Sequence, residues 1–194
     1  MAKKNSIYSI IKEVSENIDK KQKEYYEAVE LSNKVIRASS RVITMLHADR
    51  LKDAEKEVKI LKKHVSEMKK FDSEFFYYTM QAYQEYAEAI IFYMIKNDMD
   101  IPTYSDIKIR PEPYLLGLMD EVGELRREVI EELRKRRISY AEKYFAILKE
   151  IYDETRGLNI QNALLNGFRR KQDVARIQEE EAASELLLFT KNNA

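Results

Sequence analysis

The chain has 194 residues, of which 44% are hydrophobic and 35% are charged. This length is sufficient for one sizeable core, so we expect a single domain over residues 1–194. The absence of cysteine excludes disulfides and thiolate metal sites and fits a cytoplasmic location. Thirty-four basic residues balance thirty-four acidic residues, so the net charge does not by itself indicate a nucleic-acid partner.

The longest apolar segment runs from Phe75 to Ile95 and raises the question of a membrane span. It contains two Glu, two Gln and several Tyr, so we interpret it as a buried helix and expect no membrane association. The N-terminal residues precede an amphipathic pattern and lack the apolar core and cleavage site of a signal peptide. We therefore expect a soluble protein.

Helix-breaking residues are scarce and clustered. There are four Gly and three Pro, and all three prolines lie within residues 102–113. Because proline and glycine are the main breakers of periodic structure, the sequence predicts an all-α fold, a bundle of six or seven helices. No repeat, heptad array or low-complexity segment stands out.

The first half of the chain predicts three helices. Apolar residues recur at helical spacing over residues 7–46, which predicts one long helix or two in line, followed by a break at residues 47–51. A second helix is expected around residues 58–68. Asp72 or Ser73 is expected to cap a third helix that extends to about residue 97.

The second half predicts three more helices after a polar loop at residues 98–112, in which residues 107–109 could be a short extended piece. Pro113 suits the first turn of a fourth helix that ends near residue 137. A Ser139 cap is expected to start a fifth helix, which Gly157 closes. The last helix is expected from about residue 159 to residue 188, and its leucines at 186–188 are candidate interface residues.

Two acidic pairs lie in apolar helices. Glu85 and Glu88 are the only charges within residues 75–95, and their spacing places them on one helix face. This face is either a solvent-facing stripe, or its carboxylates need a cation or hydrogen bonds. Asp120 and Glu124, four residues apart, form the second pair. These two acids could instead favour a helix dipole or pair with nearby arginines.

Taken together, four carboxylates on two helices could build a divalent-metal site. Mg²⁺ and Mn²⁺ prefer carboxylate oxygens and water. A di-iron site needs Glu-x-x-His motifs, and neither His47 nor His64 has a Glu three residues before it. The acids therefore favour metal-assisted hydrolysis of phosphodiesters or pyrophosphates. Gly117 and Gly123 interrupt the helix of Asp120, either for close helix packing or to leave room for a substrate.

A basic strip is a candidate phosphate contact. Arg37 and Arg41 are spaced four residues apart on the first helix, and His47 follows them. An ordinary solvated basic face explains this pattern. The alternative is a strip that binds RNA phosphates, because arginine holds phosphate through two hydrogen bonds.

At these residues the chain resembles the translin superfamily, and in particular its catalytic branch, translin-associated factor X. The similarity lies in residues 84–89 (QEYAEA), 114–125 (YLLGLMDEVGEL) and 168–173 (FRRKQD), and more weakly in residues 40–47. The second of these motifs is the most specific. The shorter loop at residues 98–112 favours a prokaryotic, archaeal member.

The resemblance implies an all-helical, translin-like subunit of a hollow homo-octamer. It also implies a Mg²⁺-dependent endonuclease for single-stranded RNA, and single-stranded DNA is a further candidate substrate. The metal-site positions of the catalytic branch match Glu85, Glu88, Asp120 and Glu124. Two alternatives stay open: a non-catalytic protein that binds single-stranded nucleic acid, and a Mg²⁺-dependent nucleotide pyrophosphatase.

Overall fold

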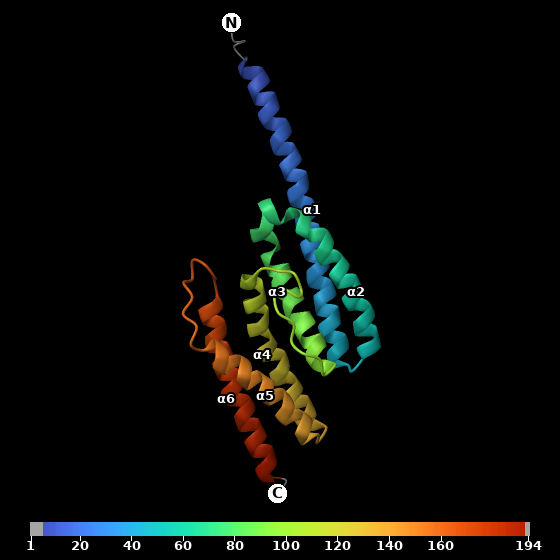
Figure 1. The fold of residues 1–194 in the computed structure, drawn as a ribbon, viewed down its shortest axis with the longest axis vertical. Coiled ribbons are helices and arrows are strands. Elements are labelled where there is room, and N and C mark those ends of the chain that lie inside the picture. Colours follow the sequence, from blue (N-terminus) through green and yellow to red (C-terminus); the bar gives the residue numbers. More distant parts are fainter. Residues whose placement is uncertain (1–5, 193–194) are drawn as a thin grey trace.

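The computed structural model describes residues 6–192 of the chain. This part is all α, without a strand, which confirms the predicted fold class. Figure 1 shows the arrangement of α1 (Ile7–His47), α2 (Leu51–Met68), the short 3-10 helix η1 (Lys69–Phe71), α3 (Asp72–Lys96), α4 (Pro111–Arg134), α5 (Ile138–Thr155) and α6 (Phe168–Asn192).

Helix α3 lies at the centre of the molecule and separates two apolar cores. Ile90 and Phe92 contribute to a core shared with α1 and α2, whereas Ile91 and Ile95 contribute to a core shared with α4, α5 and α6. A helix that is apolar on both sides is stable only when it is covered on both sides. In Figure 1 the α1–α2 pair accordingly lies on one side of α3, and α4 to α6 lie on the other.

Helix α1 is a single helix of 41 residues, which is the longer of the two predicted alternatives. Its C-terminal half buries small residues such as Ala28 and Val35 in the bundle. Its N-terminal half extends beyond the bundle, so the start of α1 and the end of α6 lie at opposite ends of the long axis (Figure 1). The predicted break at residues 47–51 is confirmed, because α2 begins at Leu51 after a turn in which Asp49 has a positive φ of 53°.

The two predicted caps do not act as such. Neither the start of α3 nor that of α5 has a side-chain cap hydrogen bond, although both helices begin close to the predicted residues. The Asp72 carboxylate instead accepts a hydrogen bond of 2.7 Å from the Tyr83 hydroxyl. The acidic side chain therefore fixes the next turns of α3 and not its first amides.

Two loop predictions were wrong. Residues 107–109 are not extended, because a turn closed by Asp106, which accepts from the Thr103 amide at 2.8 Å, makes this segment compact. Residues 158–161 have no regular structure and residues 162–167 form turns and a bend, so α6 begins at Phe168 and not near residue 159. The amide of Gly167, whose φ is +82°, donates to the Asn162 side chain at 3.2 Å, and this conformation suits glycine and ends the turn.

No helix in the described part of the chain is long and apolar enough to cross a membrane.

Candidate functional site

The site is positioned by a close approach of α4 to α3. A Cβ atom on Gly117 would lie 2.5 Å from the backbone oxygen of Gln84 and 2.8 Å from the Cβ atom of Ala87, so only glycine fits here. A Cβ atom on Gly123 would lie 3.2 Å from Nε2 of Gln178 in α6. Both glycines therefore serve helix packing, and Gly123 does not open room for a substrate.

This contact brings the acids of α3 and α4 together. Glu88 is only 8% exposed, so it does not belong to a solvent-facing stripe. Burial, together with the charges of Asp120, Glu85 and Glu124, raises the pKa of Glu88 to about 9. Burial and the Asp120 charge also raise the pKa of Glu85. The four carboxylates repel one another because too little positive charge lies between them.

Lysine 171 supplies a cation at one edge of this group. The Nζ atom of Lys171 in α6 donates to Oδ1 of Asp120, and Nε2 of Gln84 donates to Oδ2 of the same carboxylate at 2.6 Å. The Lys171 charge lowers the pKa of Glu85 and Glu88, but burial and the neighbouring acids outweigh it. Asp120 is thus oriented from both sides, whereas the two α3 carboxylates keep raised pKa values.

A fifth carboxylate completes the group. Glu121 has no exposed surface, and neither of its side-chain oxygens has a hydrogen-bond partner within the described chain. Burial, followed by the charge of Glu88, raises the pKa of Glu121 well above its ordinary value. Sequence analysis overlooked this residue, although it lies three positions before Glu124 and shares its face of α4. Glu128 and Glu132 continue the same face.

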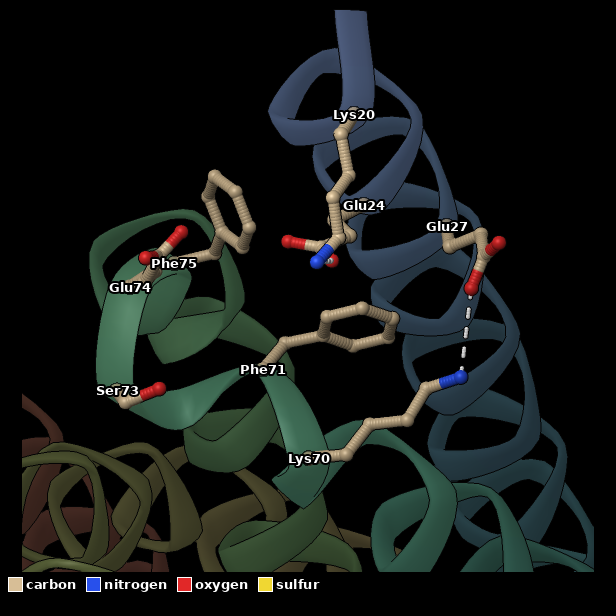
Figure 2. Close-up of a pocket in the computed structure, with 8 residues that line it drawn as sticks. All are labelled: Lys20, Glu24, Glu27, Lys70, Phe71, Ser73, Glu74 and Phe75. Carbon is tan, nitrogen blue, oxygen red and sulfur yellow. Dashed lines mark hydrogen bonds and ion pairs between the residues drawn. The ribbon is translucent and has the colours of Figure 1, made fainter. Parts of the chain in front are cut away.

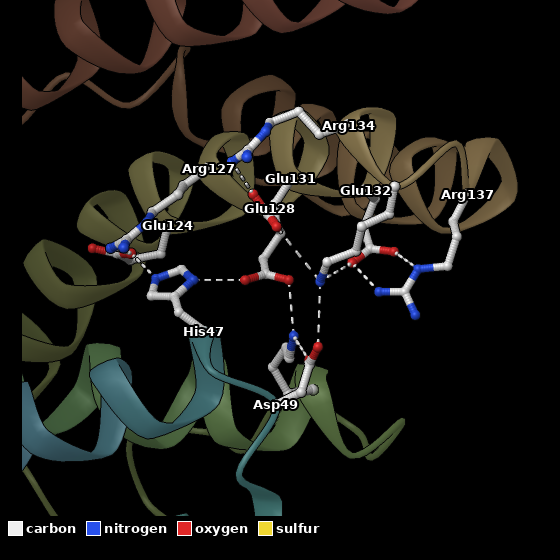
Figure 3. A network of polar contacts seen from close by, with 11 residues as sticks. His47, Asp49, Glu124, Arg127, Glu128, Glu131, Glu132, Arg134 and Arg137 are labelled. Atoms are coloured by element: carbon white, nitrogen blue, oxygen red, sulfur yellow. Dashed lines mark hydrogen bonds and ion pairs between the residues drawn. The ribbon is translucent and has the colours of Figure 1, made fainter.

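The structure places His47 among these acids and away from the basic strip. Figure 3 shows its ring between Glu124 and Glu128 of α4. Its Nδ1 atom lies 2.6 Å from Oε1 of Glu128, and its Nε2 atom contacts Oε2 of Glu124. Burial alone would lower the pKa of His47, but the two carboxylates outweigh burial and raise it. Both ring nitrogens are therefore engaged by carboxylates, which leaves neither for a phosphate.

An alternating chain of charges continues from His47 to the surface. Lys96, whose side chain is 5% exposed, lies 2.8 Å from Oε2 of Glu128 and 3.0 Å from Oδ1 of Asp49. Beyond it, Glu132 is paired with Arg137 and Lys135, as Figure 3 shows in part. The pKa of Glu128 is lowered because its hydrogen bonds with His47 and Lys96 outweigh the effect of its burial. Here each buried carboxylate has a cationic partner.

The other two residues of the basic strip remain on the surface. Arg37 is exposed, and it makes no ion pair or hydrogen bond within residues 6–192. The Nε atom of Arg41 donates to Oε1 of Glu57 in α2 at 2.9 Å. Of the two arginines of the strip, Arg37 therefore presents a guanidinium without a hydrogen-bond partner in the described part of the chain, whereas Arg41 is paired.

A cavity of about 350 Å³ opens between α4 and α6 next to the acids. Asp120 forms one wall, and Arg170 and Lys171 form another. The cavity therefore places two cationic side chains beside the carboxylates. Neither cation was singled out by sequence analysis, although both belong to the FRRKQD segment that it noted.

The donor set fits a hard divalent cation in its chemistry. The acidic group offers carboxylate oxygens only, which is the donor chemistry that Mg²⁺ and Mn²⁺ prefer, and both oxygens of Glu121 lack a hydrogen-bond partner in the described part of the chain. Within residues 6–192, however, no three His, Asp or Glu side chains converge as a preformed metal site. Side-chain rotation is needed for Glu85, Glu88, Asp120 and Glu124 to ligate one ion.

The fold and the site together describe an all-helical bundle with a group of carboxylates between its central helices. Comparisons with known proteins show to which family this bundle belongs. The model of the translin family matches residues 6–179, so the chain belongs to the translin family. An uncharacterized protein of Methanocaldococcus jannaschii is 32% identical over 171 residues, which cover 86% of this chain and 76% of that protein.

Solved structures agree with this assignment. The complex of AfC3PO with duplex RNA has a TM-score of 0.86 at 25% identity, covering 94% of this chain and 97% of that chain. The structure of apo-NeC3PO has a TM-score of 0.87 at 23% identity, covering 95% and 100% of the two chains, and supports the fold alone. The resemblance stated from the sequence motifs is thereby confirmed at the level of the family.

Proposed function

We propose that this protein is a metal-dependent endoribonuclease that binds and cleaves single-stranded RNA inside a homo-oligomeric shell, an octamer. Cytoplasmic location and single-stranded DNA as a second substrate are parts of this proposal. The observation that carries it is the group of buried carboxylates between α3 and α4, in which Glu88 and Glu121 have raised pKa values and too few cationic partners. Such a group is stabilised by a divalent cation.

In this proposal Glu85, Glu88, Asp120 and Glu124 hold Mg²⁺ or Mn²⁺. When bound, the ion supplies an activated water molecule and offsets the charge that develops on the phosphodiester. Gln84 and His47 orient the carboxylates of Asp120 and Glu124, which they contact directly.

The adjacent cavity supports a role in nucleic-acid binding. Arg170 and Lys171 line it together with Asp120, and cationic side chains of this kind bind phosphate groups. Lys171 can leave Asp120 for a phosphate oxygen once the carboxylate has another cation. The similarity to AfC3PO, which was solved with duplex RNA, supports RNA as the polymer.

The decisive experiment is cleavage of a labelled single-stranded RNA with and without Mg²⁺. We expect cleavage by the unmodified protein only with the metal, and none by Asp120→Asn or Glu124→Gln. RNA affinity of both variants should be unchanged or higher, because each removes a negative charge without adding volume. Glu150→Gln, at an exposed position of α5, is the matched control and should cleave normally. If a variant that carries both Asp120→Asn and Glu124→Gln cleaves as fast as the unmodified protein, the metal-site assignment is wrong.

A non-catalytic RNA-binding protein is the second candidate. It is favoured by one observation: Lys171 already contacts Asp120, and the carboxylates do not converge as a preformed metal site. In the same experiment this candidate predicts RNA binding without cleavage at any metal concentration. The two proposals therefore differ in whether the RNA is cleaved when the metal is present.

A further inference from the structure

Among the four carboxylates of the proposed metal site, Asp120 is distinguished by a lysine partner. The Nζ atom of Lys171 donates to Oδ1 of Asp120, and Nε2 of Gln84 donates to Oδ2 at 2.6 Å. A carboxylate binds a divalent cation through these same oxygens, and an ammonium group and a metal ion beside one oxygen repel each other. Lys171 and a metal ion are therefore alternative cationic partners of Asp120.

Lys171 is held less firmly than Lys96, the other lysine that contacts an acid of α4 from a different helix in the centre of the bundle. The side chain of Lys96 is 5% exposed and contacts two acids, Glu128 and Asp49. The side chain of Lys171 is 25% exposed, and Asp120 is its only ion-pair partner within residues 6–192. A single, partly exposed ion pair contributes little to stability, so Lys171 can change its partner at little cost.

The cavity between α4 and α6 gives the Lys171 ammonium group a second place to bind an anion. Lys171 lines this cavity together with Arg170, whose guanidinium has no ion-pair or hydrogen-bond partner in the described part of the chain. Asp120 is the only acid among the lining residues. Two cations therefore face one carboxylate, and a phosphate that binds both cations draws Lys171 away from Asp120.

A larger cavity, between α1 and the start of α3, lacks this balance of charge. It measures about 510 Å³, and its lining includes two lysines and three glutamates (Figure 2). One of the lysines, Lys70, already contacts Glu27 at 3.3 Å. Because acids outnumber cations there, the local potential repels a phosphate. The cavity between α4 and α6 is the better phosphate site of the two.

We propose that Lys171 leaves Asp120 for an RNA phosphate when a divalent cation binds, so that the metal and the RNA strengthen each other's binding. This inference rests on the proposed function, because it uses the same metal ligands and the same substrate. Lys171 holds Asp120 in place until the metal arrives and then contacts a phosphate of the single strand in the adjacent cavity. Gln84 keeps its hydrogen bond to Asp120 during this exchange and prevents the carboxylate from rotating away.

The exchange makes the two ligands cooperative. If only the metal binds, Lys171 loses its acidic partner. If only the phosphate binds, Asp120 loses its cation among the other acids of α3 and α4. When both bind, Lys171 and Asp120 each gain a partner of opposite charge, so each ligand raises the affinity for the other by the same factor, typically about 5-fold to 150-fold for coupled sites. The exchange also explains why the carboxylates do not converge as a preformed metal site within residues 6–192.

The first test measures the affinity for Mn²⁺ without RNA, from the electron paramagnetic resonance signal of free Mn²⁺. Lys171→Met should bind Mn²⁺ at least about fivefold more tightly than the unmodified protein, because the competing cation is gone. Arg170→Met is the matched control. It removes the same charge from the same cavity but leaves the partner of Asp120 in place, so its affinity should change much less. Equal affinities of the two variants would overturn the exchange, because general electrostatic repulsion would then explain both.

A second test measures the coupling itself, with a short 2′-O-methyl oligouridylate whose intact length is verified by gel electrophoresis. This strand should raise the Mn²⁺ affinity of the unmodified protein, and a methylphosphonate strand of the same sequence, which has an uncharged backbone, should not. In Lys171→Met the increase should be lost. Circular dichroism checks that helix content is unchanged, and Lys171→Gln replaces the variant if it does not fold.

The outcomes separate this inference from the proposed function. If the charged strand raises the Mn²⁺ affinity equally in the unmodified protein and in Lys171→Met, the exchange is wrong, whereas the metal site stands. If neither protein binds Mn²⁺ under any condition, the proposed metal-dependent activity is wrong, and the exchange is overturned with it.

Discussion

Buried carboxylates lie at both ends of one face of α4, but only those at the C-terminal end have cationic partners. At the C-terminal end, Glu128 is 1% exposed and Glu132 is 2% exposed, and both are paired with cationic side chains. At the N-terminal end, Glu121 has no exposed surface and no hydrogen-bond partner within residues 6–192, and its pKa is raised by the charge of Glu88 on α3. Burial is equal at both ends, so the difference lies in the supply of positive charge.

This difference divides one face of α4 into an ion-paired part and a part with unpaired carboxylates, which the proposed function uses. A buried ion pair with satisfied hydrogen bonds holds two helices in register, and Lys96 connects α3 to α4 in this way. Carboxylates left without cations raise one another's pKa and are stabilised by any cation that enters. His47 joins the two parts, because it contacts Glu128 of the first and Glu124 of the second.

The largest effect is expected from breaking the paired end. Lys96→Met keeps the aliphatic stem but leaves Glu128 buried beside a single cation, and removing one partner of a buried pair destabilises proteins by about 3–5 kcal/mol. Urea unfolding should show this loss. Lys149→Met, whose ion pair with Asp153 lies on the surface, is the matched control and should leave the free energy of unfolding nearly unchanged.

A substitution at the unpaired end should instead increase the free energy of unfolding measured in urea. Glu121→Leu removes a buried carboxyl group that has no partner, and such groups typically cost about 1–3 kcal/mol. If Glu121→Leu and Lys96→Met destabilise the protein equally, the contrast between the two ends is wrong.

A smaller effect should follow from supplying the missing charge. Mg²⁺ or Mn²⁺ that binds only the folded state adds about 2–3 kcal/mol at a hundredfold excess over its dissociation constant, so the melting temperature should rise. Glu85→Gln combined with Glu88→Gln should raise the melting temperature without metal and abolish the response to it. If the melting temperature does not change with the metal, and the double substitution is neutral or destabilising, then Glu85 and Glu88 are not metal ligands.

A pH titration without metal should sharpen the contrast further. A carboxyl whose folded pKa is raised keeps its proton in the folded state, so it favours folding below its unfolded pKa and loses this effect as pH rises. For Glu88 the window runs from its ordinary pKa of 4.5 to about 9. His47, with its raised pKa, acts in the same direction above pH 6.5. Side-chain rotation and entry of water limit the change from pH 5 to pH 8 to on the order of 1–2 kcal/mol.

Stability against unfolding by urea should therefore fall between pH 5 and pH 8, and Glu88→Gln should weaken this dependence. A stability that increases with pH in this window would mean that the carboxylates are already neutralised. The lowered pKa of Glu128 does not interfere, because its contribution is lost only below pH 4.5.

Much of the fold was predictable because breakers and periodicity are local properties. The scarcity of Gly and Pro predicted the all-α class, and the break at residues 47–51 lies where Asp49 takes a positive φ. The start of α6 was misplaced because residues 158–167 contain helix formers, and the turns before α6 are shown only by contacts in the folded chain, such as the bond between Gly167 and Asn162. Such a contact depends on the conformation and has no periodic signal.

The candidate site was predictable only in part. Paired acids in apolar helices pointed to Glu85, Glu88, Asp120 and Glu124, and the structure places these four around one helix contact. Whether a carboxylate has a cation depends on residues distant in sequence, such as Lys96 for Glu128 and Lys171 for Asp120. For the same reason His47, which follows two arginines in sequence, was grouped with them and not with the acids that it contacts.

The smallest expected effect tests the same contrast between paired and unpaired charge on the surface of α1. If the strip contacts phosphates, Arg37→Ala should weaken RNA binding and reduce the slope of log affinity against log salt by up to about 0.7, since one single-strand contact is lost. Arg41→Ala should have less effect, because Glu57 already offsets its charge. Fluorescence anisotropy over a salt series measures both, with Arg156→Ala as an ion-paired surface control. Helicity should persist in all three variants. Equal slopes for Arg37→Ala and the control would assign Arg37 and Arg41 to an ordinary solvated face, and RNA binding would then rest on the cations beside Asp120.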